Sequence, residues 1–202
     1  MNVLVVGAHP DDFEIGMAGT IRKHVRHGDQ IYAIIMSNGE KIGLKEIRKK
    51  EASKSAKFLG ISEVFFFNLP DTSIPCNSQN IERVEKIIVK YNIARVYTHS
   101  LRDTHQDHLN TSRTVLAAAR NVPQILFYES PSSDLDFRPT FFVDISPYLN
   151  DKIRSLNMYD SINKLKKRYL EIKAVRSNSF FRGYQSKMSC AESFEVYKFI
   201  EP

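Results

Sequence analysis

The sequence predicts an α/β protein of three layers, in which a mainly parallel sheet is covered by helices on both faces. Short apolar, β-branched segments alternate with amphipathic segments from residue 2 to residue 128 of the 202-residue chain. Each apolar segment is continuous enough to be buried on both faces, which is typical of parallel strands. Strands that alternate with helices form such a sheet, so we expect a Rossmann-like fold.

Five strands and four helices account for this alternation. The strands are expected at Asn2–Val6, Gln30–Met36, Glu63–Asn68, Ala94–Thr98 and Gln124–Tyr128. The helices are expected at Gly16–His27, Ile42–Leu59, Ser78–Tyr91 and Asp107–Arg120. Gly28 and Gly60 each follow a helix, where a glycine in the left-handed conformation commonly ends it.

The last third of the chain predicts a mixed C-terminal appendage. A strand is expected at Phe141–Ile145, a helix start at Ser146-Pro147, a basic helix at Lys164–Arg176 and a terminal strand at Phe194–Ile200. The length suits one domain, so we expect residues 1–202 to fold as a single unit.

The charge of the chain decides little about its partners. The formal net charge is +6, but the cations are spread over several segments. Local runs at Lys45–Lys50 and Lys164–Arg168 are interpreted as solvated helix faces. Because no nucleic-acid motif accompanies them, no nucleic-acid partner is expected.

Location is predicted from the apolar segments and the cysteines. The sequence contains no run of about 18 apolar residues, so no membrane span is predicted. The apolar stretch at the N-terminus is too short for a secretory signal, so it is interpreted as a buried strand of a cytoplasmic protein. Cys76 and Cys190 share no short spacing, so neither a disulfide framework nor a cysteine metal site is predicted.

The segment directly after the first strand is the strongest sign of chemistry. It reads Gly7-Ala8-His9-Pro10-Asp11-Asp12-Phe13-Glu14 and holds one imidazole and three carboxylates. Sites in open parallel sheets form beyond the carboxyl ends of the strands. Carboxylates this close repel one another unless a cation lies among them, and a divalent metal would supply it. The alternative is a loop whose carboxylates cap the next helix.

A second polar segment, Thr98–His108, follows the fourth predicted strand and should meet the first at the same edge of the sheet. His105 and His108 are three residues apart and can face one cavity while only one binds a metal. The other can then donate a proton. A catalytic zinc typically takes three protein ligands and leaves a position for water. For His24 and His27 we favour a structural, hydrogen-bonded role.

Other classes of site lack their motifs. Gly7 and Gly16 do not form GxGxxG, and the sequence contains neither a GxxxxGK[ST] phosphate loop nor an HExxH helix. A GxSxG nucleophile elbow is also absent, which disfavours a serine hydrolase. The sequence therefore points to chemistry with a metal and water.

These motifs resemble those of the LmbE/PIG-L deacetylases. Ala8–Glu14 is similar to the AHPDD-x-E signature of that family, and His105–His108 is similar to its H-x-D-H motif. Further similarities lie at Arg48–Glu51 with Leu59-Gly60, at Leu69–Asp71, at Tyr128–Ser132 and at Arg182–Phe194. The tail departs from the family pattern, because Lys187 stands at a glycine and Cys190 at a tyrosine.

The resemblance implies a Rossmann-like, zinc-dependent enzyme that removes the N-acetyl group from an N-acetylglucosamine-type sugar or conjugate. It implies His9, Asp12 and His108 as metal ligands, with Zn²⁺ as the usual ion and Fe²⁺ as an alternative. Asp11 is implied as the general base that activates water at the metal.

The resemblance also assigns roles around this centre. His105 is implied as the general acid or as the cation that stabilises the oxyanion. Asp107 is implied to orient a histidine. Arg48 and Asp71 are implied to hydrogen-bond sugar hydroxyls, and ordinary surface or capping duty is the alternative for them and for Glu192.

We also expect a phosphorylated or nucleotide-linked substrate, because Arg48, Arg102 and Arg182 would form a positive rim. A homo-oligomer is implied by the resemblance, and Phe137–Tyr148 and Phe180–Tyr184 could supply its interface or belong to the core. A non-catalytic carbohydrate- or metal-binding module is the alternative function. It predicts loss of the base or of a ligand, and all of these residues are present.

Overall fold

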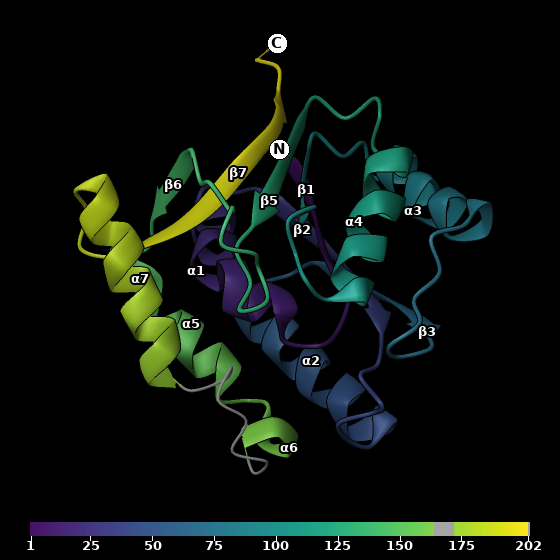
Figure 1. The fold of residues 1–202 in the computed structure, drawn as a ribbon, viewed down its shortest axis with the longest axis horizontal. Helices are drawn as coiled ribbons and strands as arrows, with labels where there is room; N and C mark the ends of the chain where they lie inside the picture. The colour runs from purple at the N-terminus through teal and green to yellow at the C-terminus, as the bar shows by residue number, and fades with distance from the viewer. Residues whose placement is uncertain (164–171, 202) are drawn as a thin grey trace.

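The computed structural model describes residues 1–163 and 172–201 and has the predicted three-layer α/β fold (Figure 1). Its seven-stranded sheet has the order β3-β2-β1-β4-β5-β7-β6. The strands are β1 (Asn2–Gly7), β2 (Gln30–Ser37), β3 (Glu63–Leu69), β4 (Arg95–His99), β5 (Gln124–Tyr128), β6 (Phe141–Asp144) and β7 (Ala191–Phe199). The first five pair in parallel, whereas β7 runs antiparallel to both β5 and β6.

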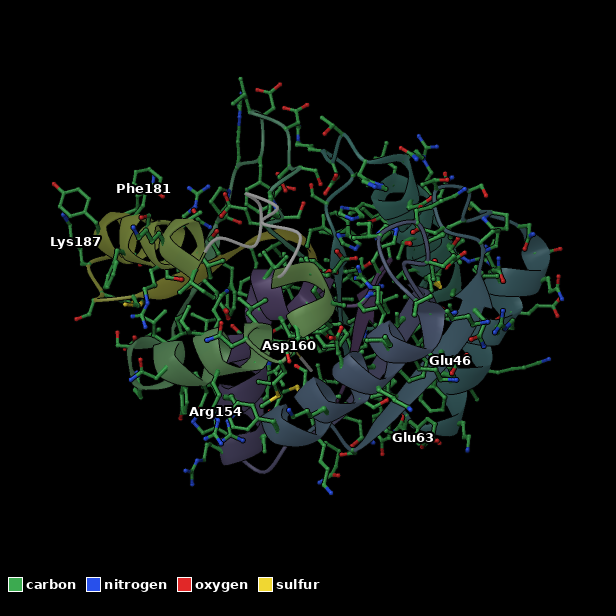
Figure 2. The ribbon with its side chains drawn as sticks, turned by 90° about the horizontal axis from the view of Figure 1, so that it is seen from below. Glu46, Glu63, Arg154, Asp160, Phe181 and Lys187 are labelled. Carbon is green, nitrogen blue, oxygen red and sulfur yellow. The ribbon has the colours of Figure 1, made fainter. Side chains whose placement is uncertain are left out.

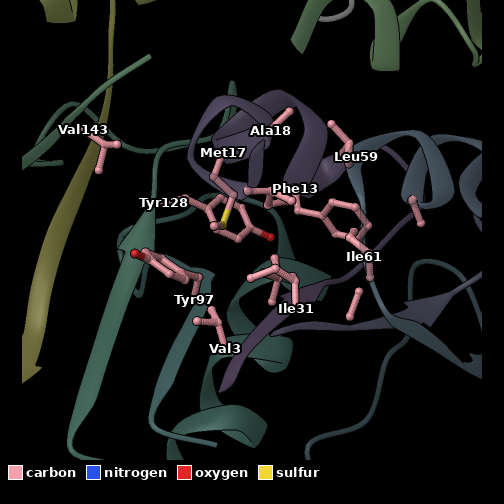
Figure 3. Packing of buried hydrophobic residues seen from close by; sticks show 14 of the residues in the cluster. Val3, Phe13, Met17, Ala18, Ile31, Leu59, Ile61, Tyr97, Tyr128 and Val143 are labelled. Carbon is pink, nitrogen blue, oxygen red and sulfur yellow. The ribbon is translucent and has the colours of Figure 1, made fainter. Parts of the chain in front are cut away.

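Helices cover both faces of the sheet. They are α1 (Asp12–Arg26), α2 (Lys45–Leu59), α3 (Ser78–Lys90), α4 (Gln106–Ala118), the 3₁₀ turn η1 (Ser146–Tyr148), α5 (Leu149–Leu156), α6 (Asp160–Asn163) and α7 (Ile172–Ser186). Val3 and Val5 of β1 pack with α1 and α2, while Leu4 and Val6 pack with α3 and α4. This alternation explains why the strand is apolar throughout. Figure 3 shows the first of these cores, where Phe13 of α1 meets the sheet.

The predicted elements are confirmed over the described residues, with differences at several ends, among them β7, which begins at Ala191 rather than Phe194. α1 begins at Asp12 rather than Gly16, and a non-helical residue, Met17 (φ −152°), interrupts it. α2 begins at Lys45 rather than Ile42, because Leu44 is still extended (φ −66°, ψ 123°). Residues 164–171 of the predicted basic helix lie outside the described residues, and α7 continues ten residues past Arg176 to Ser186. Gly28 and Gly60 have positive φ values, as expected.

Two predictions about individual residues are also resolved. His24 is buried and hydrogen-bonded to Asp29 (2.6 Å) and to the Tyr97 hydroxyl (3.0 Å), which confirms its structural role. The same prediction is wrong for His27, which is exposed and whose side chain makes no hydrogen bond within the described residues. Lys187 has a φ of 61°, the left-handed conformation that glycine prefers, at the position where the resemblance leads us to expect a glycine.

The two aromatic stretches proposed as an interface differ in exposure. Val143 and Ile145 of the first stretch belong to the core. In the second stretch Phe180, Phe181 and Tyr184 are 51–77% exposed, and Figure 2 shows Phe181 on the outer side of α7. Across residues 1–163 and 172–201, the structure has no helix that is long and apolar enough to cross a membrane.

Candidate metal centre and active site

The two polar loops lie side by side at the carboxyl edge of the sheet, as the sequence predicted. β1 and β4 are neighbouring parallel strands, with Val5 paired to Tyr97. One loop leads from β1 into α1 and the other from β4 into α4. Because both strands end at the same edge, His9–Asp12 and His99–His108 meet there.

The first loop turns its carboxylates into the site through a strained residue. Asp11 has a φ of 94°, which is uncommon outside glycine. The Ile15 N–H donates to the Asp11 carbonyl at 2.9 Å and closes the turn. The Asp12 carboxylate accepts a hydrogen bond from the His9 N–H at 2.7 Å. Strain of this kind persists at functional sites only where the surroundings hold it.

Asp12 lies among three imidazoles. Its carboxylate oxygens are 3.0 Å from His99 Nε2, 3.5 Å from His108 Nε2 and 3.6 Å from His9 Nδ1. Burial alone would raise the pKa of Asp12, but His108 and His99 hold it well below its usual range. Asp12 is therefore a carboxylate that remains ionised in a buried place.

Three overlapping triads of metal-type residues occur among the described residues. They are His9–His105–His108, Asp12–His99–His108 and His9–Asp71–Asp107, each with ligand atoms within 4.8 Å of one another. The predicted ligands are divided between the first two triads, which share His108. The structure therefore brings His9, Asp12 and His108 together and adds His99 and His105 as neighbours.

The donors present fit a divalent cation such as zinc. Imidazole nitrogens and carboxylate oxygens are its ordinary ligands. Beside them, Asp11 Oδ2 is buried and has no hydrogen-bond partner among the described residues. Burial raises the pKa of Asp11 to about 8, against the opposing charge of Arg48. The site thus holds clustered ligands next to a carboxylate whose proton affinity is unusually high.

Asp107 is placed to orient His9. Its carboxylate lies 3.0 Å from His9 Nε2 and accepts hydrogen bonds from the N–H groups of Thr72 (2.7 Å) and Ile74 (3.0 Å). Burial alone would lower the pKa of His9, but its hydrogen bonds to Asp107 and Asp12 hold it well above the usual value. With Nε2 facing Asp107, Nδ1 is the nitrogen that faces Asp12.

A second carboxylate, Asp103, orients His108 and was not recognised from the sequence. Asp103 Oδ2 lies 2.9 Å from His108 Nδ1 and accepts a hydrogen bond from Ser130 Oγ at 2.6 Å. Burial alone would lower the pKa of His108, but Asp12 and Asp103 raise it to about 9. The only sequence signal was the position of Asp103 two residues before His105.

His99 is the other residue that the sequence analysis did not assign. It is fully buried at the end of β4, with Nε2 3.1 Å from both the Ala8 N–H and the Tyr128 hydroxyl. Its ring stacks on His108 at a centroid distance of 3.8 Å. Burial, together with the charge of His108, lowers the pKa of His99 to about 4. A strand-end histidine carries no local pattern that would predict this contact.

His105 occupies the N-cap of α4, where its Nδ1 accepts a hydrogen bond from the Asp107 N–H at 3.2 Å. It is half-buried and lines the same cavity as Asp11. Burial and the neighbouring charges of His108 and His9 lower the pKa of His105. Near neutral pH this imidazole is therefore mainly in its uncharged form.

The cluster opens into a cavity of about 320 Å³. Both predicted substrate-binding residues line it. Arg48 is 1% exposed and donates to the Pro10 carbonyl at 2.6 Å, while its Nε and Nη1 have no partner in the described part of the chain. Asp71 accepts from the Lys41 N–H at 2.9 Å and lies 3.2 Å from His9 Nε2.

The predicted rim of three arginines is wrong. Arg102 is 51% exposed and pairs with Asp136 and Glu195, beside a different cavity. Arg182 forms a bidentate pair with Glu129 in the neighbouring cavity. Their positions depend on loop and helix packing that the sequence did not reveal.

This arrangement, with two histidines and an aspartate beside a buried carboxylate at the sheet edge, has the donor set of a candidate metal site. The chain matches the family described as PIG-L, GlcNAc-PI de-N-acetylase, over residues 4–119. It belongs to this family of LmbE-like deacetylases.

Three similar proteins illustrate the range of the family and its fold. The chain is 33% identical to a protein from Escherichia coli K12, the uncharacterized deacetylase YaiS, over 79% of this chain and 90% of that one. Its fold is similar to that of N,N'-diacetylchitobiose deacetylase from Pyrococcus horikoshii (TM-score 0.84, 23% identity, 96% and 83% of the chains). It is also similar to GalB, a 4-carboxy-2-hydroxymuconate hydratase from Pseudomonas putida KT2440 (TM-score 0.87, 20% identity, 100% and 98%).

Proposed function

We propose that this protein is a zinc-dependent hydrolase that removes the N-acetyl group from an N-acetylglucosamine-type sugar or sugar conjugate. The observation that carries the proposal is the buried Asp11 carboxylate, with its pKa near 8, beside the cluster of His9, Asp12 and His108. Membership of a deacetylase family supports hydrolysis of an amide, and the acetylated amino sugars in the names of relatives support the substrate class.

His9, Asp12 and His108 would hold the ion, with Fe²⁺ as the alternative to zinc. Such an ion supplies Lewis-acid chemistry, polarising a carbonyl and increasing the acidity of water in the site. Asp107 and Asp103 fix the rings of His9 and His108 through their second nitrogens. Carboxylates in this position orient ligands and raise their basicity.

Asp11 takes the proton from the attacking water. Its raised pKa makes it a stronger base than an ordinary aspartate, closer to the value that suits proton transfer at neutral pH. The water oxygen then adds to the acyl carbon of the substrate. Arg48, 3.6 Å from Asp11, keeps the carboxylate in place through charge.

His105 acts on the other product of the reaction. The C–N bond breaks, the acyl group leaves as acetate, and the amine nitrogen receives a proton. His105 lines the cavity, and once it is protonated it can donate this proton or, as a cation, stabilise the oxyanion that precedes bond cleavage.

Arg48 and Asp71 would bind the sugar. The Arg48 N–H groups that lack a partner among the described residues suit hydroxyl or carbonyl oxygens, and Asp71 can accept from a hydroxyl. Without Arg102 and Arg182 the expectation of a phosphorylated or nucleotide-linked substrate loses two of its three supports. An N-acetylated sugar without phosphate is therefore the first substrate to test.

The test combines metal analysis of the purified protein with acetate release from a panel of N-acetylated sugars, with and without chelator. We expect about one zinc ion per chain and acetate release that the chelator abolishes. Because the fold also serves a hydratase, the panel includes 4-carboxy-2-hydroxymuconate. Hydration of this acid without acetate release would replace the proposed reaction. Metal binding with neither reaction would favour the non-catalytic module.

Three further expectations from the sequence stay predictions: a single domain over residues 1–202, a cytoplasmic location and a homo-oligomer. The exposed aromatic side chains of Phe180, Phe181 and Tyr184 on α7 are the surface on which we expect self-association. Sedimentation analysis of wild type and Phe181→Ser checks this assembly.

A further inference from the structure

Helix α1 is broken just after the turn that carries the candidate site. Met17 has φ −152° and ψ 24°, outside the helical region, so the regular hydrogen-bond pattern stops there. The turn before the break contains Asp12 and Glu14. At the break the helix lies against β5, because a Cβ added to Gly16 would be 2.4 Å from the Tyr128 ring. Figure 3 shows Met17 close to this ring.

A buried ion pair, Lys152–Glu192, forms hydrogen bonds with the backbone groups that lack helical partners at the break. Glu192 of β7 accepts hydrogen bonds from the N–H groups of Gly19 (3.0 Å) and Thr20 (2.7 Å) and from Thr20 Oγ1 (2.7 Å). Lys152 of α5 donates to the Ile15 carbonyl at 2.6 Å and to Glu192 Oε1 at 2.6 Å. Glu192 thus caps the second part of α1, and Lys152 caps the first.

This pair is linked to the catalytic loop through one residue. The carbonyl of Ile15 accepts from Lys152, and its N–H donates to the carbonyl of Asp11. Its side chain lines the cavity. Asp11 is the strained residue of the loop, with φ 94°, and such a conformation relaxes unless neighbouring contacts hold it.

We propose that Lys152 and Glu192 form a clip that positions the first turn of α1, and with it Asp11 and Asp12, for the reaction. The inference rests on the proposed function for its effect on rate, but the clip's effect on metal binding is independent of it. Lys152 and Glu192 are positioning residues, because both act through the backbone of α1. Both side chains are at most 3% exposed, so the clip is held apart from competing water.

A neighbouring ion pair provides a matched control. Asp151, one residue before Lys152 on α5, accepts from Arg22 Nε of α1 at 2.8 Å. This pair joins the same two helices but lies beyond the break, and its carboxylate is 31% exposed. Asp151→Asn therefore removes a link between α1 and α5 without touching the first turn.

The experiment compares Lys152→Met/Glu192→Gln with Asp151→Asn, using Co²⁺ as a spectroscopic probe in place of zinc. The double variant leaves no unpaired charge in the core. We expect its kcat to fall about 100-fold with KM little changed, because a displaced base acts on the chemical step. We expect its Co²⁺ affinity to fall about 10- to 100-fold, with an altered visible spectrum. Asp151→Asn should match the wild type in kcat, KM, Co²⁺ affinity and visible spectrum.

Wild-type kcat and Co²⁺ spectrum in a folded double variant would overturn the clip, and so would equal changes in Asp151→Asn. If the double variant does not fold, Glu192→Gln alone is used, because it keeps one capping oxygen. It should show smaller losses of kcat and Co²⁺ affinity. A wild-type spectrum and rate in this variant would also overturn the clip. If the wild-type protein is inactive but its Co²⁺ spectrum still changes in the double variant, the proposed function is wrong and the clip is supported.

Discussion

The two buried charge clusters that flank the first turn of α1 differ in how completely their polar atoms are paired. In the clip, Lys152 Nζ makes two hydrogen bonds and both oxygens of Glu192 accept at least one. In the site, atoms of four side chains are buried without a partner among the described residues. They are Asp11 Oδ2, Glu14 Oε2, His99 Nδ1, and Arg48 Nε and Nη1.

This difference separates a structural cluster from a functional one. A buried polar atom without a hydrogen bond costs roughly 1–3 kcal/mol, so several of them in one place call for a partner such as a bound ion, a water molecule or a ligand. The pKa values agree with this interpretation, since Asp11 is raised to about 8 and His99 is lowered to about 4. Perturbed groups that converge on a cavity are typical of active sites.

The largest expected effect comes from removing the base. Asp11→Asn should lower kcat by about 10²- to 10⁴-fold, the range for loss of a general base. Metal content should stay unchanged, because Asp11 is not among the proposed ligands. His108→Ala is the contrasting variant, and it should lose metal. Kinetics with metal analysis checks both, and a fully active Asp11→Asn enzyme would contradict the assignment.

Breaking the Lys152–Glu192 clip should lower the free energy of unfolding. Lys152→Met leaves Glu192 buried without its cation, which should cost about 3–5 kcal/mol of unfolding free energy. Asp151→Asn removes a partly exposed pair and should cost only about 0–1 kcal/mol. Urea denaturation measures both. Equal losses of unfolding free energy in the two variants would mean that the burial of the clip does not make it more important for stability than the exposed pair.

A smaller effect is expected from the support of the metal ligands. Asp103→Asn takes the carboxylate away from His108 Nδ1 and should weaken zinc binding by about 10- to 100-fold. Competition with a coloured chelator measures the affinity, and Ser133→Ala serves as the control, in the loop after β5 that bridges to Asp103. An unchanged affinity would reduce Asp103 to a loop-building role.

The smallest effect lies in a third, partly exposed cluster, where Asp29 meets the N-terminal ammonium group and His24. Burial alone would raise the pKa of Asp29, but these partners hold it below 3.8. Its stabilisation is therefore present above about pH 3.8 and lost as pH falls through the lower folded value. Asp29→Asn should cost about 0–1 kcal/mol at neutral pH and less at about pH 2. An equal cost at both pH values would show that charge is not the cause.

Much of this protein could be predicted from local pattern. The alternation of strands and helices depends on side chains two to four residues apart, so the sequence alone determined the five parallel strands and the helices between them. The same holds for the placement of His9, Asp11, Asp12, His105 and His108, because the ends of parallel strands share an edge.

Contacts between distant segments were decided only by the tertiary structure. His99 of β4 contacts the backbone after β1, and Asp103 contacts Ser130 in the loop after β5. Glu192 binds the backbone at the break in α1, 173 positions away in the sequence. β7 lies between β5 and β6 although it follows both in the chain. The periodicity of the local sequence does not predict such contacts. They form only when the core packs and brings polar groups from distant segments within hydrogen-bond distance of one another. The sequence thus determined which chemistry is present, and packing decided which side chains hold it in place.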